Sequence, residues 1–338
     1  MAMIGAFLAL NCGFAALIEW SDVASHPIDV QTRAVLDARL SSFFGKTDSA
    51  APRAVFLGDS VVFGSKLQNT HGDRWKWLTL PAQHAALTGD ETLNLGINGV
   101  LFSDLDCVAR EALAHGPELL VVNVSPRPFA ADFADADNTS ARSFLCEAMD
   151  VTERVGRWIP LLAYRDVWQF RWLESSPKQF LVDALAARIQ PTDPFEEDEE
   201  GEDSIDLDEI IWKTKASNRL NSVELSDDHP QSAHLDKLLG TLASHRSTDV
   251  VVLYLEEDTR ALSDQLDIER YRVQQQRFVA RLSRIAARTA NITFVHAKNS
   301  DFEGLYDDHV HLTADGYTRL ARILRDVPQS RNLGDAID

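Results

Sequence analysis

Five short apolar segments, separated by segments with helical periodicity, constrain the fold of this chain most strongly. Continuous apolar runs are typical of parallel strands that are covered on both faces. The strands expected from these runs are 53–57, 91–95, 118–124, 249–255 and 292–296. The helices expected around them are 28–44, 103–114, 235–244, 264–290 and 314–325. Because strands and helices alternate, we predict an α/β fold built on a three-layer, doubly wound parallel sheet.

The net charge of the chain argues against nucleic acid as a partner. Its 338 residues include 33 Lys and Arg against 52 Asp and Glu, a formal charge of −19, whereas a nucleic-acid binder needs a basic face. One segment, 193–209, holds 11 of these acidic residues and no basic one, and without it the charge would be −8. This segment lacks the spacing of a calcium-binding loop. It is either a solvated loop or a contact for a basic partner.

The first eighteen residues carry no charge and suit a membrane helix. As a helix they would span roughly 27 Å, near the lower limit for crossing a bilayer. We expect an uncleaved transmembrane anchor over 1–20 and a helical linker over 21–50, with a signal peptide or a buried helix as alternatives. Trp20 suits the membrane interface, and acidic residues follow it. The expected localisation is therefore a single-pass membrane protein with its body on the periplasmic side.

The middle of the chain interrupts the alternation of strands and helices. Residues 141–190 have a helical pattern rich in aromatic side chains, and the acidic segment follows them. We therefore expect a helical insertion over 141–232 within a main domain that covers 51–330, followed by a tail over 331–338. The aromatic stretch 158–172 suits packing within the insertion, a lid, a membrane-facing surface or a partner interface.

Two motifs carry polar residues that suit hydrolytic chemistry. Gly58-Asp59-Ser60 follows the first strand, and Asp308-x-x-His311 precedes the last helix. A serine at the carboxyl edge of a parallel sheet lies where ligands of such folds bind. Its hydroxyl becomes a nucleophile when a histidine held by a carboxylate takes its proton. The spacing allows Asp308 to orient the His311 ring so that its second nitrogen faces Ser60.

This pair of motifs resembles the SGNH, or GDSL-like, hydrolase family. The resemblance includes Leu312-Thr313 after the histidine and a glycine-led last helix, and it covers roughly 51–330 without the insertion. It implies that Ser60 is the nucleophile, that His311 is the base and that Asp308 orients it. It implies no metal and no cofactor.

The family's oxyanion hole is matched only in part. The run Asn94-Leu-Gly-Ile-Asn-Gly99 fits the second family block, which implies the Gly99 N–H as a donor beside the Ser60 N–H. The third block departs, because Asn123-Val-Ser125-Pro-Arg127 stands where the family has Gly-x-Asn-Asp. Arg127 or Ser125 then replaces the asparagine as a donor, or the hole rests on backbone groups alone. The departure is compatible with divergent members that resemble the membrane-anchored proteins of teichoic-acid D-alanylation and alginate acetylation.

Four other residues near the motifs have roles that the sequence suggests. Trp75 and Trp77 are candidate substrate-binding residues, with core or surface packing as the alternative. Asp59 is expected to support its turn through hydrogen bonds. His309 is expected at the surface, because it faces away from Val310 in an extended segment.

The three cysteines leave the redox state of the chain open. Cys12, Cys107 and Cys146 form neither a disulfide framework nor a zinc-binding pattern. Cys107 and Cys146 either pair in an oxidising compartment or remain buried thiols.

The resemblance implies a membrane-anchored serine esterase or O-acyltransferase that forms an acyl-serine at Ser60. The expected substrate is an acyl ester of a cell-envelope carbohydrate or lipid, and the expected partners are the membrane and a membrane protein. The alternative is a catalytically silent accessory subunit whose N-terminal helix packs through its small residues on other membrane helices. A soluble secreted esterase would follow if the first helix were cleaved.

Overall fold

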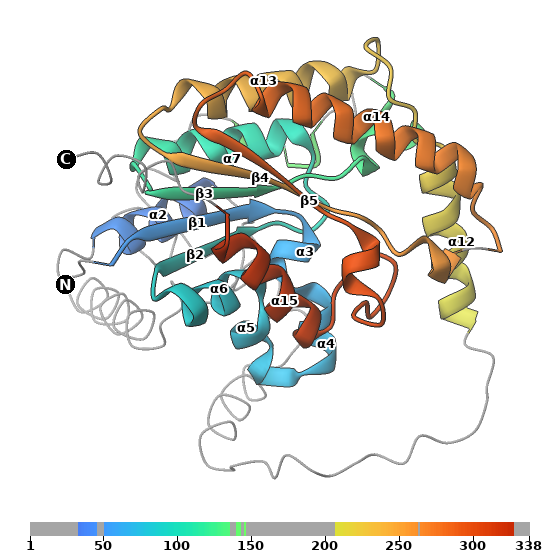
Figure 1. Cartoon of the computed structure of the whole chain (residues 1–338), viewed down its shortest axis with the longest axis horizontal. Helices are drawn as coiled ribbons and strands as arrows, with labels where there is room; N and C mark the ends of the chain where they lie inside the picture. The colour runs from blue at the N-terminus through green and yellow to red at the C-terminus, as the bar shows by residue number, and fades with distance from the viewer. Residues whose placement is uncertain are drawn as a thin grey trace, which may run out of the picture.

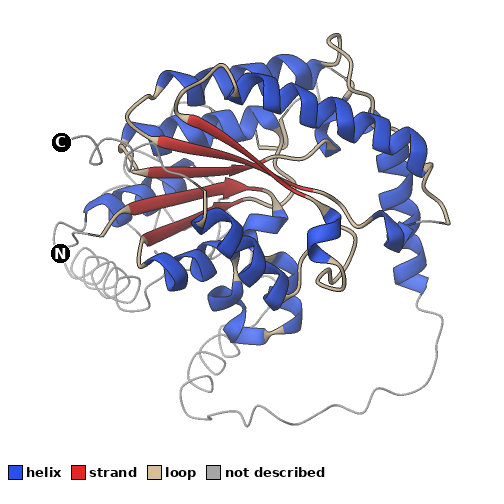
Figure 2. Cartoon of the chain, in the orientation of Figure 1, coloured by secondary structure: helices blue, strands red, loops and turns tan. Residues whose placement is uncertain are grey.

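A five-stranded parallel sheet forms the centre of the protein, in the strand order β2-β1-β3-β4-β5 (Figures 1 and 2). The computed structural model describes residues 33–45, 51–135, 140–142, 145–146, 207–262 and 264–327. The strands are β1 (Arg53–Gly58), β2 (Glu91–Gly96), β3 (Leu119–Asn123), β4 (Asp249–Leu255) and β5 (Ile292–Ala297). Because β2 and β3 flank β1 on opposite sides, the winding reverses between β1 and β3, which is where such folds bind ligands.

Helices cover both faces of the sheet, so the predicted doubly wound parallel α/β architecture is confirmed (Figure 1). The longer helices are α2 (Arg33–Gly45), α6 (Leu80–Thr88), α7 (Phe102–Ala114), α12 (Leu207–Asn221), α13 (Pro230–Ser244), α14 (Ile268–Ala286) and α15 (Ala314–Arg325). Shorter turns of helix are α3 (Ser60–Phe63), α4 (Ser65–Thr70), η1 (Gly72–Arg74), α5 (Trp75–Leu78), η2 (Arg127–Phe129), η3 (Ala131–Phe133), η6 (Thr259–Leu262) and η7 (Asn299–Phe302).

The core consists of two apolar clusters, one on each face of the sheet. Val55 and Leu57 of β1 point to the face covered by α2, α7, α13 and α14. Ala54 and Phe56 of the same strand point to the opposite face, which α6 and α15 cover. All four side chains are fully buried. Burial on both faces explains why the strands have continuous apolar sequences.

Several predicted elements agree closely with the structure, and the differences have local causes. β4 and α15 have the predicted bounds. α14 is shorter than the predicted 264–290, since Asp267 caps its first turn by accepting a hydrogen bond from the Arg270 N–H at 3.1 Å. α13 begins earlier than predicted, at Pro230, because the His229 side chain caps it and proline is well suited to a first helical turn.

Other predicted segments lie outside the described residues. They are the anchor 1–20, most of the linker 21–50, most of the insertion 141–232 and the tail 331–338. Within the part of the chain that is described, no helix combines the length and apolar character needed to span a bilayer. The anchor and the domain bounds therefore stay predictions.

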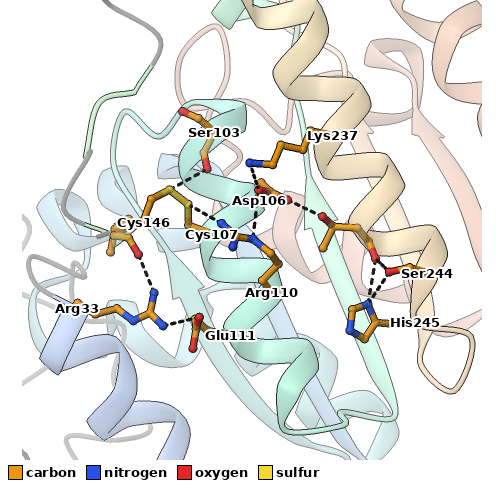
Figure 3. Close-up of polar contacts among 12 residues, drawn as sticks. Arg33, Ser103, Asp106, Cys107, Arg110, Glu111, Cys146, Lys237, Ser244 and His245 are labelled. Carbon is orange, nitrogen blue, oxygen red and sulfur yellow. Dashed lines mark hydrogen bonds and ion pairs between the residues drawn. A yellow bond between two sulfur atoms is a disulfide. The ribbon is translucent and has the colours of Figure 1, made fainter. Parts of the chain in front are cut away.

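A disulfide joins Cys107 in α7 to Cys146, near the start of the expected insertion (Figure 3). The two Cα atoms are 5.3 Å apart, across a sequence separation of 39 residues. Beside the disulfide, Arg33 forms an ion pair with Glu111 and donates a hydrogen bond to the Leu145 carbonyl at 2.8 Å. Of the two states that the sequence leaves open for these cysteines, the structure has the paired one.

Candidate active site

The two polar motifs meet at the carboxyl edge of the sheet, although 251 residues separate them. Ser60 follows β1, while Asp308 and His311 lie between η7 and α15. His311 Nε2 lies 2.9 Å from Ser60 Oγ, and His311 Nδ1 lies 2.7 Å from Asp308 Oδ2. With the proton on Nδ1 donated to the carboxylate, Nε2 is left as the acceptor for the serine hydroxyl.

A tight turn fixes the position and the charge of Asp308. Its Oδ1 accepts hydrogen bonds from the backbone N–H groups of Val310 and His311, both at 2.8 Å. Burial opposes ionisation, but the bond from the His311 ring and these backbone donors outweigh it and lower the pKa of Asp308 to about 2. Asp308 is therefore ionised at neutral pH and can stabilise a positive charge on His311.

The turn before Ser60 is anchored to the neighbouring strand. Asp59 caps α3 by accepting a hydrogen bond from the Val61 N–H at 3.0 Å. The same oxygen accepts a hydrogen bond from Asn123 Nδ2, at the end of β3, at 3.3 Å. These contacts confirm the structural role expected for Asp59.

Gly96 allows α3, which begins at Ser60, to pack directly on the end of β2. A Cβ at this position would collide with the backbone of Phe63. Next to it, the Asn94 side chain donates to the Val62 carbonyl and accepts from the Gly96 N–H, both at 2.9 Å. A larger residue at position 96 would therefore displace the helix that carries Ser60.

Gly99 lies in the turn after β2, with a φ of 74° that favours glycine. A side chain at this position would meet nothing within 4 Å, so the turn faces open space. No described residue accepts a hydrogen bond from the Gly99 N–H or the Ser60 N–H. Both donors are therefore available to a substrate, although their role in an oxyanion hole stays a prediction.

Arg127 lies against the turn that carries Gly99. Its Nη2 donates a hydrogen bond to the Val100 carbonyl at 2.7 Å. This contact supports the turn, and the oxyanion role of Arg127 stays a prediction. Ser125, the other candidate from the third block, is half-buried and makes no hydrogen bond to a described residue.

His309 is largely covered by other side chains, which corrects the expectation of a surface position. Its side chain is 13% exposed, and its ring packs edge-on against Trp212 of α12 with centroids 4.8 Å apart. Its Nδ1 lies 4.0 Å from Asp308 Oδ1 and has no hydrogen-bond partner in the described part of the chain. Burial lowers the pKa of His309 to about 4, with Asp308 opposing the shift and His311 adding to it. A neutral imidazole thus lies beside the Asp308–His311 pair.

The two tryptophans that follow Ser60 face different surroundings. Trp75 is half-buried, with its ring 5.4 Å from that of Phe63 in α3, and it packs into the core around α15. Trp77 is 61% exposed, and the Lys76 ammonium lies 5.8 Å from its ring centroid. Substrate binding by either residue stays a prediction.

A second histidine–carboxylate pair lies at the ends of β4 and β5. His296 Nε2 is 2.7 Å from Glu256 Oε1, and Glu256 Oε2 accepts a hydrogen bond from the Asn299 N–H at 2.9 Å. Burial opposes ionisation, but these bonds outweigh it and lower the pKa of Glu256. Across the described residues, no three His, Cys, Asp or Glu side chains are grouped in a way that could hold a metal ion.

No protein-family model and no curated protein matches this chain. Among solved structures, a protein from Streptococcus pneumonia whose description names a platelet activating factor is 13% identical, with a TM-score of 0.37 over 93% of this chain and 97% of that chain. A protein from Desulfitobacterium hafniense described as lipolytic and of the G-D-S-L family is 12% identical, with a TM-score of 0.36 over 80% and 98%. A gut microbial diltiazem-metabolizing enzyme is 12% identical, with a TM-score of 0.40 over 81% and 46%.

The description of the second of these proteins names the family that the two motifs resemble.

Proposed function

We propose that this protein is a serine esterase or O-acyltransferase of SGNH type that acts through an acyl-serine at Ser60. One observation carries the proposal: Ser60, His311 and Asp308 form a continuous chain of contacts at 2.9 and 2.7 Å. A serine joined to a histidine that a carboxylate orients is the arrangement that activates a hydroxyl for acyl transfer.

In the proposed reaction, His311 Nε2 takes the Ser60 proton as Oγ attacks the ester carbonyl, and Asp308 stabilises the imidazolium that forms. The N–H groups of Ser60 and Gly99 donate to the oxyanion of the tetrahedral intermediate, where one donor typically contributes about 3 kcal/mol. Collapse of the intermediate passes the proton from His311 to the leaving alcohol and leaves an acyl-serine. Water then releases the acid, or an acceptor hydroxyl takes the acyl group.

The proposed setting is the periplasmic face of a membrane, and the proposed substrate is an ester of an envelope carbohydrate or lipid. The uncharged first eighteen residues support the membrane location. The Cys107–Cys146 disulfide supports an oxidising compartment, because disulfides are rare in the reducing cytosol. A membrane-protein partner is part of the same proposal.

Labelling with a fluorophosphonate probe tests the nucleophile. The wild-type protein should form a covalent adduct, and Ser60→Ala should form none. The matched control is Ser244→Ala, at the end of α13 and at the opposite edge of the sheet, which should label as the wild type does. Folding of each variant is checked by circular dichroism. A folded wild-type protein without a Ser60-dependent adduct would favour the accessory-subunit alternative.

A second measurement separates hydrolysis from acyl transfer. The reaction of the unlabelled wild-type enzyme with 4-nitrophenyl acetate is run with and without a sugar alcohol, and the products are analysed by mass spectrometry. Acetylated alcohol identifies a transferase, whereas acetate alone identifies a hydrolase.

A further inference from the structure

Two arginines, one of which contacts the Gly99 turn, approach the same aromatic ring. The Arg127 guanidinium carbon lies 5.7 Å from the centroid of the Phe133 ring, and that of Arg219 lies 5.9 Å from it. Contacts of this kind hold a guanidinium group against the ring face. Arg127 also donates to the carbonyl of Val100, next to Gly99. Arg127 therefore lies beside the candidate oxyanion donor and shares the Phe133 ring with a second positive charge, in a chain with a net charge of −19.

The charge of Arg127 is not neutralised by direct contact. Among the described residues, its guanidinium has one hydrogen-bond acceptor, a backbone carbonyl, and it forms no ion pair. Asp59 and Asp104 are within electrostatic range, but both carboxylates accept hydrogen bonds from other groups. Burial lowers the pKa of Arg127, Asp59 opposes this effect, and Arg219 adds to it. Because an arginine stays protonated, this half-buried charge favours an anion from outside the chain.

Arg219 is held in place while part of its guanidinium stays available. Its Nε pairs with Asp132 Oδ2 at 3.1 Å, which leaves the Nη1 and Nη2 groups without a further acceptor among the described residues. The segment that follows Arg219 is fixed to η3, because the Ala131 N–H donates a hydrogen bond to Ser222 Oγ at 3.1 Å. The side chain itself is exposed to solvent.

The helix that carries Arg219 passes from one side of the candidate site to the other. Trp212 and Arg219 are seven residues apart and so lie on the same face of α12. Trp212 packs on His309, beside the Asp308–His311 pair, whereas Arg219 reaches the ring shared with Arg127. Figure 1 shows α12 at the end of the molecule toward which the strands point. A substrate at Ser60 would therefore have α12 beside it.

We propose that Arg127 and Arg219 bind an anionic group, a carboxylate or a phosphate, that the substrate carries beside its scissile ester. This inference rests on the proposed function and names its substrate class. Guanidinium groups recognise carboxylates and phosphates through pairs of N–H donors. At physiological salt, exposed charges farther than about 8 Å away are largely screened, so the distant acidic residues weigh little at this site. The near carboxylate of Asp132 engages Arg219 through its Nε and leaves the two Nη groups for a ligand.

The test compares two esters of similar length, anionic 4-nitrophenyl hemisuccinate and neutral 4-nitrophenyl butyrate. In Arg219→Gln, kcat/KM for the hemisuccinate should fall about tenfold relative to that for the butyrate, the loss expected for one charge-assisted contact. Arg219→Lys should recover part of the preference, because it keeps the charge. The matched control is Arg325→Gln at the far end of α15, which should leave the ratio unchanged. Competition by succinate and by inorganic phosphate shows which of the two anions binds more tightly.

The outcomes separate this inference from the proposed function. If Arg219→Gln lowers kcat/KM equally for both esters, the anion site is wrong. If Arg127→Gln alone lowers kcat/KM equally for both esters, Arg127 is an oxyanion donor and does not belong to the anion site. If Ser60 is not needed for cleavage of either ester, the proposed function is wrong, and this result says nothing against the anion site. Calorimetric binding of succinate then decides the inference, and binding that Arg219→Gln leaves unchanged would overturn it.

Discussion

Two histidine–carboxylate pairs near the carboxyl edge of the sheet have the same separation but different third partners. His311 and Asp308 approach to 2.7 Å, and so do His296 and Glu256. The second nitrogen of His311 lies 2.9 Å from a serine hydroxyl. The ring of His296 instead stacks on that of Tyr254, with centroids 5.5 Å apart and an interplanar angle of 6°.

The difference shows that a carboxylate-bound histidine is not by itself a catalytic unit. Both Asp308 and Glu256 have pKa values lowered mainly by bonds to their histidines, against the effect of burial. What separates the pairs is the further contact that each ring makes: His311 meets a hydroxyl at its second nitrogen, whereas His296 meets an aromatic ring on its face. A hydroxyl at a ring nitrogen gives the histidine a proton to take, whereas a stacked aromatic ring only packs against it.

The largest expected effect comes from removing each histidine in turn. His311→Asn should lower kcat for 4-nitrophenyl acetate by about 10⁴-fold or more, since the serine then lacks its base. His296→Asn should change kcat by less than about threefold, because its ring touches no reacting group. Steady-state kinetics on folded variants measure both. Comparable losses in the two variants would contradict the division between the pairs.

Replacing the carboxylates should give the next largest effect. Asp308→Asn should lower kcat by about 10³- to 10⁴-fold, because an amide cannot stabilise the imidazolium and favours the wrong tautomer. Glu256→Gln should leave kcat within a few-fold of the wild type. The outcome that would count against this reading is a mild effect of Asp308→Asn in a protein that still labels at Ser60.

Titration of His309 should make the free energy of unfolding depend on pH. Its pKa is about 4 in the folded protein against an ordinary 6.5, so only the unfolded chain binds this proton between those values. Stability should therefore fall as pH drops from about 6.5 to about 4, by up to about 3 kcal/mol.

The variant His309→Gln should flatten this part of the stability curve. Urea unfolding at a series of pH values measures the free energy of unfolding for the variant and for the wild type. Two curves that stay parallel between pH 6.5 and 4 would show that His309 does not cause the loss.

The smallest effect is expected when the Glu256–His296 pair is broken and the stability of the protein is measured. Glu256→Gln should lower the free energy of unfolding by about 1 kcal/mol at neutral pH, because the pair is only partly buried. Urea titration measures this change. A loss well above that value would mean that the pair organises the loop after β5 as well as bonding within itself.

The sequence predicts the sheet well because its signals are local. The apolar run of β4 and the amphipathic pattern of α15 gave the bounds that the structure has. The four-residue helix α3 was not predicted as a helix, since it has no periodic pattern of its own. It forms because Asp59 caps it, Gly64 ends it at a φ of 88°, and Gly96 lets it pack closely on β2.

Other features of the site depend on residues far apart in the chain. His309 was expected at the surface from its immediate neighbours, but Trp212 of α12 covers it. Arg127 was identified as a candidate donor from its place in the third block. Its approach to the Phe133 ring together with Arg219 could not be predicted, because α12 lies far from Arg127 in the sequence.

The sequence by itself determined which strands form the sheet and that Ser60, Asp308 and His311 belong at one edge of it. Apolar periodicity and motif spacing are local properties, so they can be read without the rest of the chain. The tertiary structure alone decided that Cys107 pairs with Cys146, that Trp212 largely covers His309, and that two arginines approach the Phe133 ring. These depend on which distant elements pack together, and burial and charge pairing are properties of that packing rather than of any single segment.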